Sequence, residues 1–226
     1  MIFLVDYFYI GNYLNLPWQV AMLMFLVCMV AGYLLGSINT AILVSKKKYG
    51  ADIRTFGSGN AGLTNMKRVY GWGAAGYTLA GDMAKQILSV GIGLCLGNVP
   101  GGYIAGMFCI AGHILPCWHG FKGGKGVLTA ATMILLLDPV VFAVLLVIWF
   151  AVLLLTRYVS LASIVAAFAY PAAMFARYKG AEPFSLIFSV VIGLFVIYMH
   201  RSNIKRLFNN QESKFSFKGK KNDKSK

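Results

Sequence analysis

The chain has 226 residues, of which 58% are hydrophobic and 12% are charged, and its formal net charge is +14. A soluble domain carries about 25% charged residues, so the composition excludes an ordinary soluble protein and predicts an integral membrane protein. The basic residues stand at the ends of apolar segments, which indicates lipid headgroups, membrane topology or anionic substrates rather than nucleic acid. The four cysteines lie in apolar runs without metal-ligand spacing, which favours buried thiols.

The first apolar segment, residues 18–44, is long enough to cross a membrane with some tilt. Three lysines at 46–48 follow it directly and predict a cytoplasmic stop. No Lys or Arg precedes Lys46, so the segment lacks the basic start of a cleavable signal peptide and is expected to remain as a span. Residues 50–71 are polar and rich in glycine, and they form the first candidate loop.

Shorter apolar segments follow, and breaks at residues 98–102 and at the Asp138-Pro139 turn separate some of them. These segments are expected at residues 73–96, 103–118, 127–137, 140–156, 161–175 and 184–198. The predicted fold class is all-α and polytopic, with about seven transmembrane segments; five spans with two re-entrant segments are the alternative. We expect one membrane domain over residues 1–210 and a basic, disordered cytoplasmic tail over residues 211–226.

The distribution of basic residues orients the chain. With the N-terminus outside and seven segments threaded, only Arg177 and Lys179 of the 21 Lys and Arg residues lie outside, and the other 19 do not. The reverse threading would place nearly all of them outside, against the positive-inside rule. The C-terminus and the polar loops are therefore expected on the cytoplasmic side, and the five-span alternative predicts the same sidedness.

The first polar cluster, residues 52–68, contains a formal GxGxxG at Gly57, Gly59 and Gly62. No strand or βαβ unit is expected around it, so it is not a dinucleotide-binding fingerprint. Closely spaced glycines nevertheless allow backbone N–H groups to converge on an anion. A plain connector would rarely concentrate so many donors, so the cluster predicts a phosphate site. Its polar and basic side chains include Ser58, Asn60, Thr64, Asn65, Lys67 and Arg68.

A basic glycine loop, residues 120–126, forms the second cluster. Its central residues are Lys122, Gly123, Gly124 and Lys125. The loop differs from a Walker A motif in its spacing, and Gly126 stands where that motif has Ser or Thr. Two lysines among glycines still predict an anion cradle; the alternative is a flexible positive-inside flank. His113, in the apolar stretch before the loop, is by itself more typical of a packing residue.

Two further clusters follow. Ser160 and Ser163 come after Arg157 at a predicted helix start, where Ser160 could serve only as a helix cap. His200 and Asn203 lie in a basic segment whose alternative interpretation is a membrane stop. All four clusters share one predicted face and contain few carboxylates and histidines, which favours bound phosphate over metal or acid–base chemistry. The His-x4-Asp dyad of soluble-type acyl-CoA acyltransferases is absent from the sequence.

In these motifs the chain resembles the PlsY family, the bacterial membrane acyl-phosphate:glycerol-3-phosphate acyltransferases. The matching strings, in the family's order, are Gly36-Ser37-Ile38, residues 52–68 with GSGNAGLTN, Gly81-Asp82-Met83-Ala84-Lys85, GHILP with FKGGKGV, RYVSLAS and HRSNIKRL. They cover nearly the whole chain apart from the basic tail. The departures are Leu63, Gln86 and residues 117–119, and none of them removes a polar motif residue.

The resemblance implies transfer of a fatty acyl group from acyl-phosphate to the sn-1 hydroxyl of glycerol 3-phosphate, forming lysophosphatidic acid. It implies an active site on the cytoplasmic side of the bacterial plasma membrane, without a cofactor or a metal. The implied catalytic residues are Ser58, Arg68, Lys125, Ser163, His200 and Asn203. The implied phosphate-binding residues are Gly57, Gly59, Asn60, Gly62, Thr64, Asn65, Lys122, Gly123, Gly124 and Ser160. The implied partners are the two substrates, the bilayer and, as a candidate, the enzyme that makes acyl-phosphate.

Acyl-phosphate has a good leaving group, so its chemistry needs positioning and charge stabilisation more than a strong base. We expect direct transfer without an acyl-enzyme, with a substrate phosphate oxygen taking the hydroxyl proton and His200 as the alternative base. Asp52 and Asp82 are expected to pair with Arg54 and Lys85, which would remove them as bases. The rival functions are an organic-phosphate transporter and a scaffold that binds anionic lipid through the lysine tail.

Overall fold

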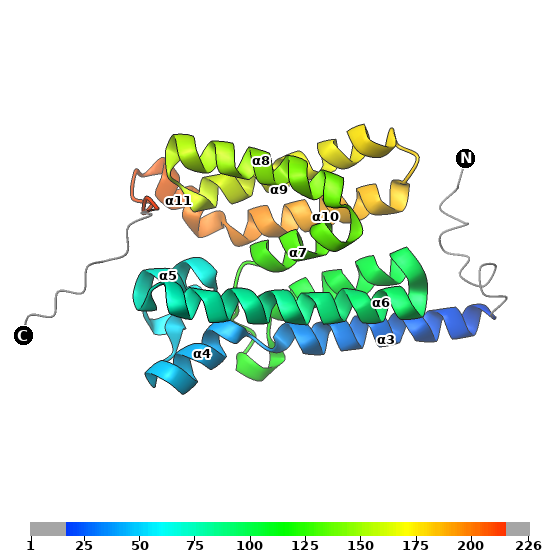
Figure 1. Cartoon of the computed structure of the whole chain (residues 1–226), viewed down its shortest axis with the longest axis horizontal. Coiled ribbons are helices and arrows are strands. Elements are labelled where there is room, and N and C mark those ends of the chain that lie inside the picture. The colour runs from blue at the N-terminus through cyan, green and yellow to red at the C-terminus, as the bar shows by residue number, and fades with distance from the viewer. Residues whose placement is uncertain (1–16, 216–226) are drawn as a thin grey trace, which may run out of the picture.

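The computed structural model describes residues 17–215. Within this range every regular element is a helix, which confirms the all-α expectation (Figure 1). The elements are α3 (Trp18–Ser37), α4 (Thr40–Tyr49), η1 (Ile53–Thr55), α5 (Leu63–Tyr70), α6 (Trp72–Ile114), η2 (Cys117–His119), α7 (Val127–Leu137), α8 (Pro139–Thr156), α9 (Val159–Tyr178), α10 (Pro183–Met199) and α11 (Arg201–Phe208).

The predicted first span is a broken helix. The chain leaves α3 at Ile38, and α4 begins after Asn39, whose side chain accepts a hydrogen bond from the Ile42 N–H and so caps α4. Gly50 ends α4 in the left-handed conformation, with φ of 66°. Lysines fill the last turn of α4, where their charge suits the negative end of the helix dipole. The chain then turns into the first polar cluster.

Helix α6 is a hairpin of two antiparallel arms. Gly97 and Asn98 leave the helical conformation between the arms, and Asn98 has a φ of 52°. A Cβ atom on Gly93 would lie 2.2 Å from the carbonyl oxygen of Gly101, so glycine allows the two backbones to touch. The predicted break is confirmed. The second arm ends at Ile114 instead of 118, because the chain there turns into the short η2.

Helix α3 packs along the second arm of α6 through small residues. A Cβ atom on Gly32 would lie 2.3 Å from the carbonyl oxygen of Ala105, and one on Gly36 would lie 2.1 Å from that of Cys109. Close backbone approach through small residues is the usual way in which helices pack inside a membrane, where apolar side chains gain little by leaving lipid.

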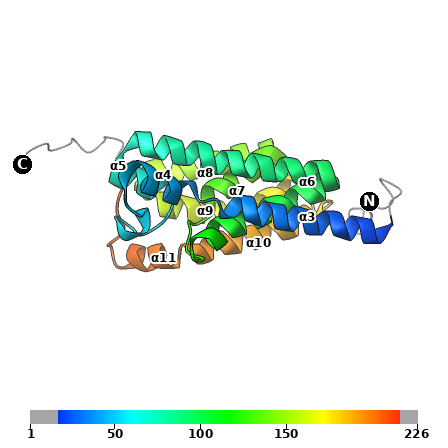
Figure 2. The same cartoon turned by 90° about the horizontal axis from the view of Figure 1, so that it is seen from below.

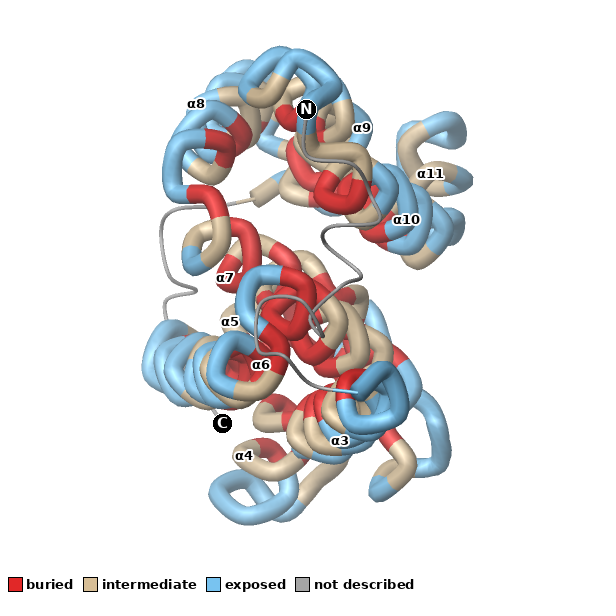
Figure 3. Tube along the Cα trace, turned by 90° about the vertical axis from the view of Figure 1, so that its right-hand side faces the viewer, coloured by how far each residue is buried: buried red, intermediate tan, exposed pale blue. Residues whose placement is uncertain are grey.

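Helices α8, α9 and α10 form a second layer, and α7 lies between this layer and the layer of α3 and α6 (Figures 1 and 3). Buried residues gather between the two layers, as Figure 3 shows in red. The outer surface is apolar, with Leu155 and Phe168 86% and 78% exposed, as a surface that faces lipid requires. Cys28 and Cys109 are buried as expected, whereas Cys95 is exposed.

Four helical stretches within residues 17–215 are long and apolar enough to cross a membrane, and a fifth results if α10 and α11, bent by 56°, count as one span. One of the four is the α6 hairpin, which contributes two arms. Helix α7 has 11 residues, about half the length of a span. The seven predicted segments are thus all present as helices in the predicted order. The number of complete crossings and the outside N-terminus stay predictions.

Residues 211–215, which we expected to belong to a disordered tail, return to the bundle. The Phe215 N–H donates to the Arg157 carbonyl oxygen at 2.6 Å, and the Lys67 ammonium lies 3.8 Å from the centre of the Phe215 ring. Residues 216–226 lie outside the described residues, so the basic tail stays a prediction over that range.

Candidate active site

A cavity of about 720 Å³ extends from one end of the bundle into its interior. Helices α4, α5 and α11 gather at this end, which we call the loop end (Figures 1 and 2). The cavity wall is polar at the loop end and apolar deeper between α7, α8, α9 and α10. The polar wall comprises Ser58, Asn60, Thr64, Asn65, Arg68, Lys125, Ser160, His200, Asn203, Arg206 and Glu212. The apolar wall includes Leu128, Leu135, Phe142, Leu145, Tyr170 and Ile192.

Four helices begin at the polar wall. The first residues of α5, α7 and α9 line the cavity, and His200 and Asn203 bring the start of α11 to it. None of these four helix starts carries a side-chain cap. The backbone N–H groups of the first turns and the positive ends of four helix dipoles therefore face the same space, which favours an anion. Ser160, in particular, is not the cap of α9.

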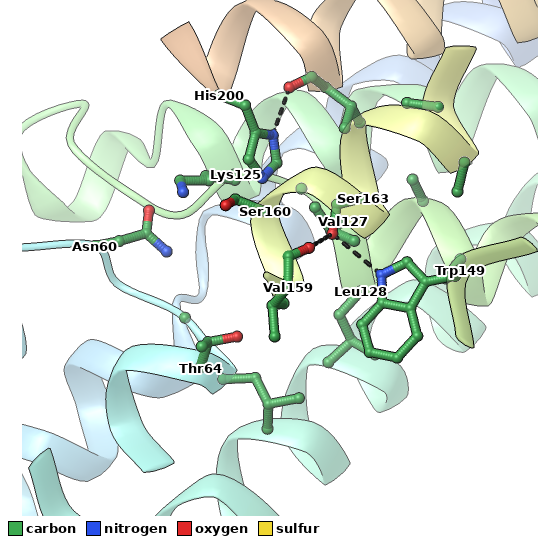
Figure 4. Close-up of a pocket in the computed structure, with 18 of the residues that line it drawn as sticks. Asn60, Thr64, Lys125, Val127, Leu128, Trp149, Val159, Ser160, Ser163 and His200 are labelled. Carbon is green, nitrogen blue, oxygen red and sulfur yellow. Dashed lines mark hydrogen bonds between the residues drawn. The ribbon is translucent and has the colours of Figure 1, made fainter. Parts of the chain in front are cut away.

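Lys125 lies between these helix starts (Figure 4). Its ammonium donates to the side-chain carbonyl oxygen of Asn203, whose amide donates to Glu212 at 2.7 Å. Glu212 also accepts hydrogen bonds from the Ser160 hydroxyl at 2.8 Å and from Arg206 at 2.7 Å. One polar network thus joins the basic glycine loop, α9, α11 and the returning segment 211–215.

The charges of this network are set by burial and by hydrogen bonding. Burial lowers the pKa of the Lys125 ammonium to about 8, while the Glu212 carboxylate acts in the opposite direction. Burial also disfavours the Glu212 carboxylate, but the hydrogen bonds from its three partners outweigh burial and lower its pKa. At neutral pH the network therefore holds a Lys125 ammonium and a Glu212 carboxylate.

His200 and Ser163 face the cavity from the start of α11 and from α9 (Figure 4). The Nδ1 atom of His200 lies 2.8 Å from the Val196 carbonyl oxygen. A carbonyl oxygen can only accept, so Nδ1 carries the proton and Nε2 of the neutral ring is left as an acceptor. The Ser163 hydroxyl donates to the Val159 carbonyl oxygen at 2.8 Å and accepts from Trp149 Nε1 at 3.2 Å. The Ser163 hydroxyl proton is therefore not directed at a base.

Asn65 shapes the first polar cluster from within. Its amide donates to the carbonyl oxygens of Ile53 and Phe56 at 3.3 and 3.0 Å, and its own oxygen accepts from the Ser58 N–H at 2.9 Å. A Cβ atom on Gly57, which has a φ of 59°, would lie 2.3 Å from that oxygen. The amide of Asn65 is thus hydrogen-bonded within the loop, whereas we had expected it to donate to phosphate.

Arg54 ties the first polar cluster to the segment that leads into the basic glycine loop. It pairs with Asp52 at 2.7 Å, as expected, and donates to the carbonyl oxygens of His119 and Lys122 at 2.6 and 3.0 Å. The hydrogen bond from Arg54 lowers the pKa of Asp52 to about 2, so the pair stays charged at every physiological pH. Asp52 is consequently not available as a base.

Twelve of the sixteen predicted site residues line the cavity, and the other four are Gly59, Lys122, Gly123 and Gly124. Lys122 is exposed. The N–H groups of Gly123 and Gly124 donate to carbonyl oxygens at the end of α6 at 3.0 and 3.1 Å, and the Gly59 N–H donates within its own turn. These N–H groups hold the loops in shape, and phosphate binding by Gly123 and Gly124 stays a prediction.

Trp149, Arg206 and Glu212 also line the cavity, although none of them was predicted from the sequence as a site residue. Glu212 is one of only two acidic residues, with Asp223, in the basic and polar segment 201–226, and this scarcity was the one available signal. Trp149 looked like any apolar residue of a span, because nothing local shows that its N–H meets Ser163. Within residues 17–215, no three His, Cys, Asp or Glu side chains are grouped so that they could hold a metal ion.

The fold and the cavity define a class: a polytopic helical membrane protein whose interior holds a cavity with a polar wall, where four helices begin, continuous with an apolar chamber. Such a chamber suits an amphiphile with a phosphate head and a hydrocarbon chain. Over residues 26–210 the chain matches the family model described as glycerol-3-phosphate acyltransferase. The chain belongs to this family, which confirms the resemblance to PlsY.

Individual relatives agree with this family assignment. The chain is 40% identical over 210 residues to the glycerol-3-phosphate acyltransferase of Salinibacter ruber, covering 84% of this chain and 92% of that one. It is 42% identical over 189 residues to the Desulforudis audaxviator enzyme, covering 82% and 93%. Crystal structures of the integral membrane acyltransferase PlsY in its glycerol 3-phosphate and lysophosphatidic acid forms are similar, with TM-scores of 0.77 and 0.75 at 34% identity. Both cover 85% of this chain, and 96% and 95% of the PlsY chains.

Proposed function

We propose that this protein transfers a fatty acyl group from acyl-phosphate to the sn-1 hydroxyl of glycerol 3-phosphate, forming lysophosphatidic acid. The observation that carries the proposal is the continuity of the cavity. Uncapped helix starts and Lys125 offer a place for phosphate, and the apolar wall between α7 and α10 offers a place for an acyl chain. An enzyme that joins a phosphate-bearing acceptor to an acyl chain needs both surfaces side by side.

In the proposed reaction the acceptor hydroxyl oxygen attacks the acyl carbonyl carbon. The bond between that carbon and the phosphate oxygen breaks, and phosphate leaves with the electron pair. The hydroxyl proton passes to a phosphate oxygen of a bound substrate. Lys125 and the four helix starts stabilise the negative charge on the departing phosphate, since preorganised donors in a buried site are where such stabilisation is strongest.

The geometry supports direct transfer rather than a covalent acyl-enzyme. The hydroxyl of Ser160 donates to Glu212, and the hydroxyl of Ser163 donates to a backbone carbonyl, so neither is presented to a basic nitrogen. His200 offers Nε2 as the alternative base. Trapping an acyl group on a serine or cysteine would contradict direct transfer, and a His200→Gln variant that binds substrates but loses chemistry would assign the base to His200.

The function is tested with purified protein in detergent. Given acyl-phosphate and glycerol 3-phosphate, it should form lysophosphatidic acid and inorganic phosphate in equal amounts without a second compartment, and acyl-CoA should not replace the donor. A transporter would form no product under these conditions, and turnover with acyl-CoA alone would reject the proposed donor.

We place the protein in the bacterial plasma membrane with the loop end in the cytoplasm. The support is the distribution of basic residues, most of which fall on the loop end, and the positive-inside rule. The enzyme that makes acyl-phosphate is the proposed partner, because its apolar, reactive product must enter a cavity at this same membrane face.

The rate should depend on pH through Lys125. Its pKa is lowered to about 8, so the ammonium that holds phosphate is lost as the pH rises from about 7 to 9. Substrate phosphates, with a second pKa near 6, are already dianionic in this range. We expect kcat/KM for glycerol 3-phosphate to fall with an apparent pKa near 8, and kcat to persist to higher pH because bound phosphate favours the charged lysine.

A Lys125→Arg variant serves as the control for this pH profile. Its guanidinium stays charged above pH 12, so the alkaline fall should disappear even if the absolute rate is lower. Profiles of kcat/KM measured from pH 6 to 10, with acyl-phosphate hydrolysis subtracted, decide the point. An unchanged alkaline limb in Lys125→Arg would show that another group titrates.

Two truncated chains should distinguish the contribution of the basic tail to activity from that of the returning segment 211–215. A chain that ends at Phe215 keeps Glu212 and its three hydrogen bonds, and its activity should stay within about twofold of the full chain. A chain that ends at Asn210 loses these bonds, which order Ser160 and Asn203 at the polar wall, and its activity should fall at least about tenfold. Equal activity of both would deny Glu212 this role, and loss in both would support the lipid-scaffold alternative.

A further inference from the structure

A buried cluster of ionisable side chains lies beneath the polar wall, where the break between α3 and α4 meets both arms of α6. It consists of Asp82, Lys85 and His113, which are 1%, 4% and 4% exposed. The Lys85 ammonium lies 2.9 Å from Asp82 Oδ1 and 2.9 Å from His113 Nδ1. It also donates to the carbonyl oxygens of Gly36 and Ile38 at 3.0 and 2.9 Å. Lys85 thus links the end of α3 to both arms of α6.

The cluster reaches the two loops that carry the phosphate-binding groups. A Cβ atom on Gly124 would lie 2.1 Å from His113 Nε2 and 2.7 Å from the Ala61 carbonyl oxygen, so the basic glycine loop and the first polar cluster meet on the His113 ring. The Gly124 N–H donates to the His113 carbonyl oxygen at 3.1 Å. Lys125, the next residue, is the one proposed above to bind phosphate. The ring of His113 therefore supports the loop that places the Lys125 ammonium.

Stability alone gives a weak reason for such a cluster. Taking a lysine and an aspartate out of water can cost more than their attraction returns, and replacement by apolar residues of similar volume is often neutral or stabilising. Inside a membrane bundle the cost is higher still, and ionisable residues there generally serve function. Lys85 does not line the cavity, whereas Asp82 and His113 do, so Lys85 itself acts without touching a substrate.

We infer that Lys85 is a positioning residue: through Asp82 and His113 it holds the basic glycine loop and the first polar cluster at the separation that phosphate transfer requires. This inference rests on the proposed acyl transfer. It assigns a task to the Gly81–Lys85 motif, which the mechanism above does not use. A displacement of about 1 Å in a catalytic group can lower a rate about 100-fold, which is why a rigid support beneath the loops matters.

The test is the double variant Asp82→Leu with Lys85→Met, which removes both charges and leaves no unpaired buried ion. We expect kcat to fall at least about tenfold and KM for glycerol 3-phosphate to rise, in protein whose folded fraction and thermal unfolding in detergent are measured beside it. If this variant does not fold, Asp82→Asn with Lys85→Gln keeps hydrogen-bonding groups and removes the same charges. The single variant Lys85→Arg keeps the positive charge and should therefore retain more of the wild-type kcat than either double variant.

The matched control is Tyr178→Phe, which removes a partly buried hydrogen bond of 2.7 Å to Asp138, at the end of α9 opposite the loop end. It should lower thermal stability without changing kcat or KM more than about twofold. A charge-free variant with wild-type kcat and KM per folded molecule would overturn the inference, as would a loss that only follows the folded fraction. Wild-type protein that makes no lysophosphatidic acid would instead reject the proposed function, and the inference with it.

Discussion

Replacing Lys125 with methionine is expected to lower kcat/KM by about 10²–10³-fold, the usual effect of removing one donor that stabilises transition-state charge. Lys125 is the one lysine on the cavity wall within residues 17–215, and it stands where α5, α7, α9 and α11 begin. Its ammonium would meet the charge that develops on the departing phosphate. Methionine keeps most of the apolar stem, so the change removes the charge and little packing.

The matched control is Lys122→Met in the same loop. Lys122 is exposed and outside the cavity wall, so its replacement should change kcat/KM by less than about threefold. Initial rates of lysophosphatidic acid formation, at varied concentrations of each substrate, give both values. Equal losses in the two variants would indicate that the loop acts through its overall charge, and the assignment of Lys125 to the leaving phosphate would fail.

Replacing Gly124 with alanine is the second change with a large expected effect. The added Cβ would lie 2.1 Å from His113 Nε2 and 2.7 Å from the Ala61 carbonyl oxygen; the first atom belongs to a buried ring in contact with Lys85, and the second is backbone. The loops must separate, which should cost about 1–3 kcal/mol of stability. Because Lys125 moves with the loop, we expect at least about a 100-fold loss of kcat.

The control for this change is Gly73→Ala, at the start of α6. No atom lies within 4 Å of a Cβ there, and alanine is a better helix former than glycine. Its activity should equal that of the wild type, with stability unchanged or slightly higher. Thermal unfolding and kcat are measured on both variants. A Gly124→Ala protein with normal kcat would show that the loop adapts and that its close contact with His113 is not needed.

The periodicity of apolar residues and the position of the basic residues were enough to predict much of this protein. Inside a bilayer the chain must satisfy its backbone hydrogen bonds internally, which favours helices. Apolar runs separated by Gly, Pro and lysine clusters therefore indicate the segments directly. The break near Asn98 and the ion pairs of Asp52 and Asp82 were predicted for local reasons and are confirmed. Motif order was also sufficient to recognise the family.

The individual tasks of the motif residues depend on long-range contacts. Lys122 and Lys125 look equivalent in the sequence, but the first is exposed and the second lies among four helix starts. Gly123 and Gly124 have the composition of an anion cradle, yet their N–H groups complete the end of α6. Glu212 was assigned to a tail and instead accepts hydrogen bonds from residues on α9 and α11.

The linear pattern alone therefore establishes the class of protein, its helices and the collection of polar groups for which we propose phosphate binding. These properties follow from hydropathy, charge and local backbone preferences, which act over a few residues. Only the packed structure decides which lysine faces the cavity, which glycines are needed for close contact and where the buried Asp82–Lys85–His113 cluster lies. The physical reason is that a site is a meeting of segments up to about 150 residues apart in the chain, and no local preference encodes their distances.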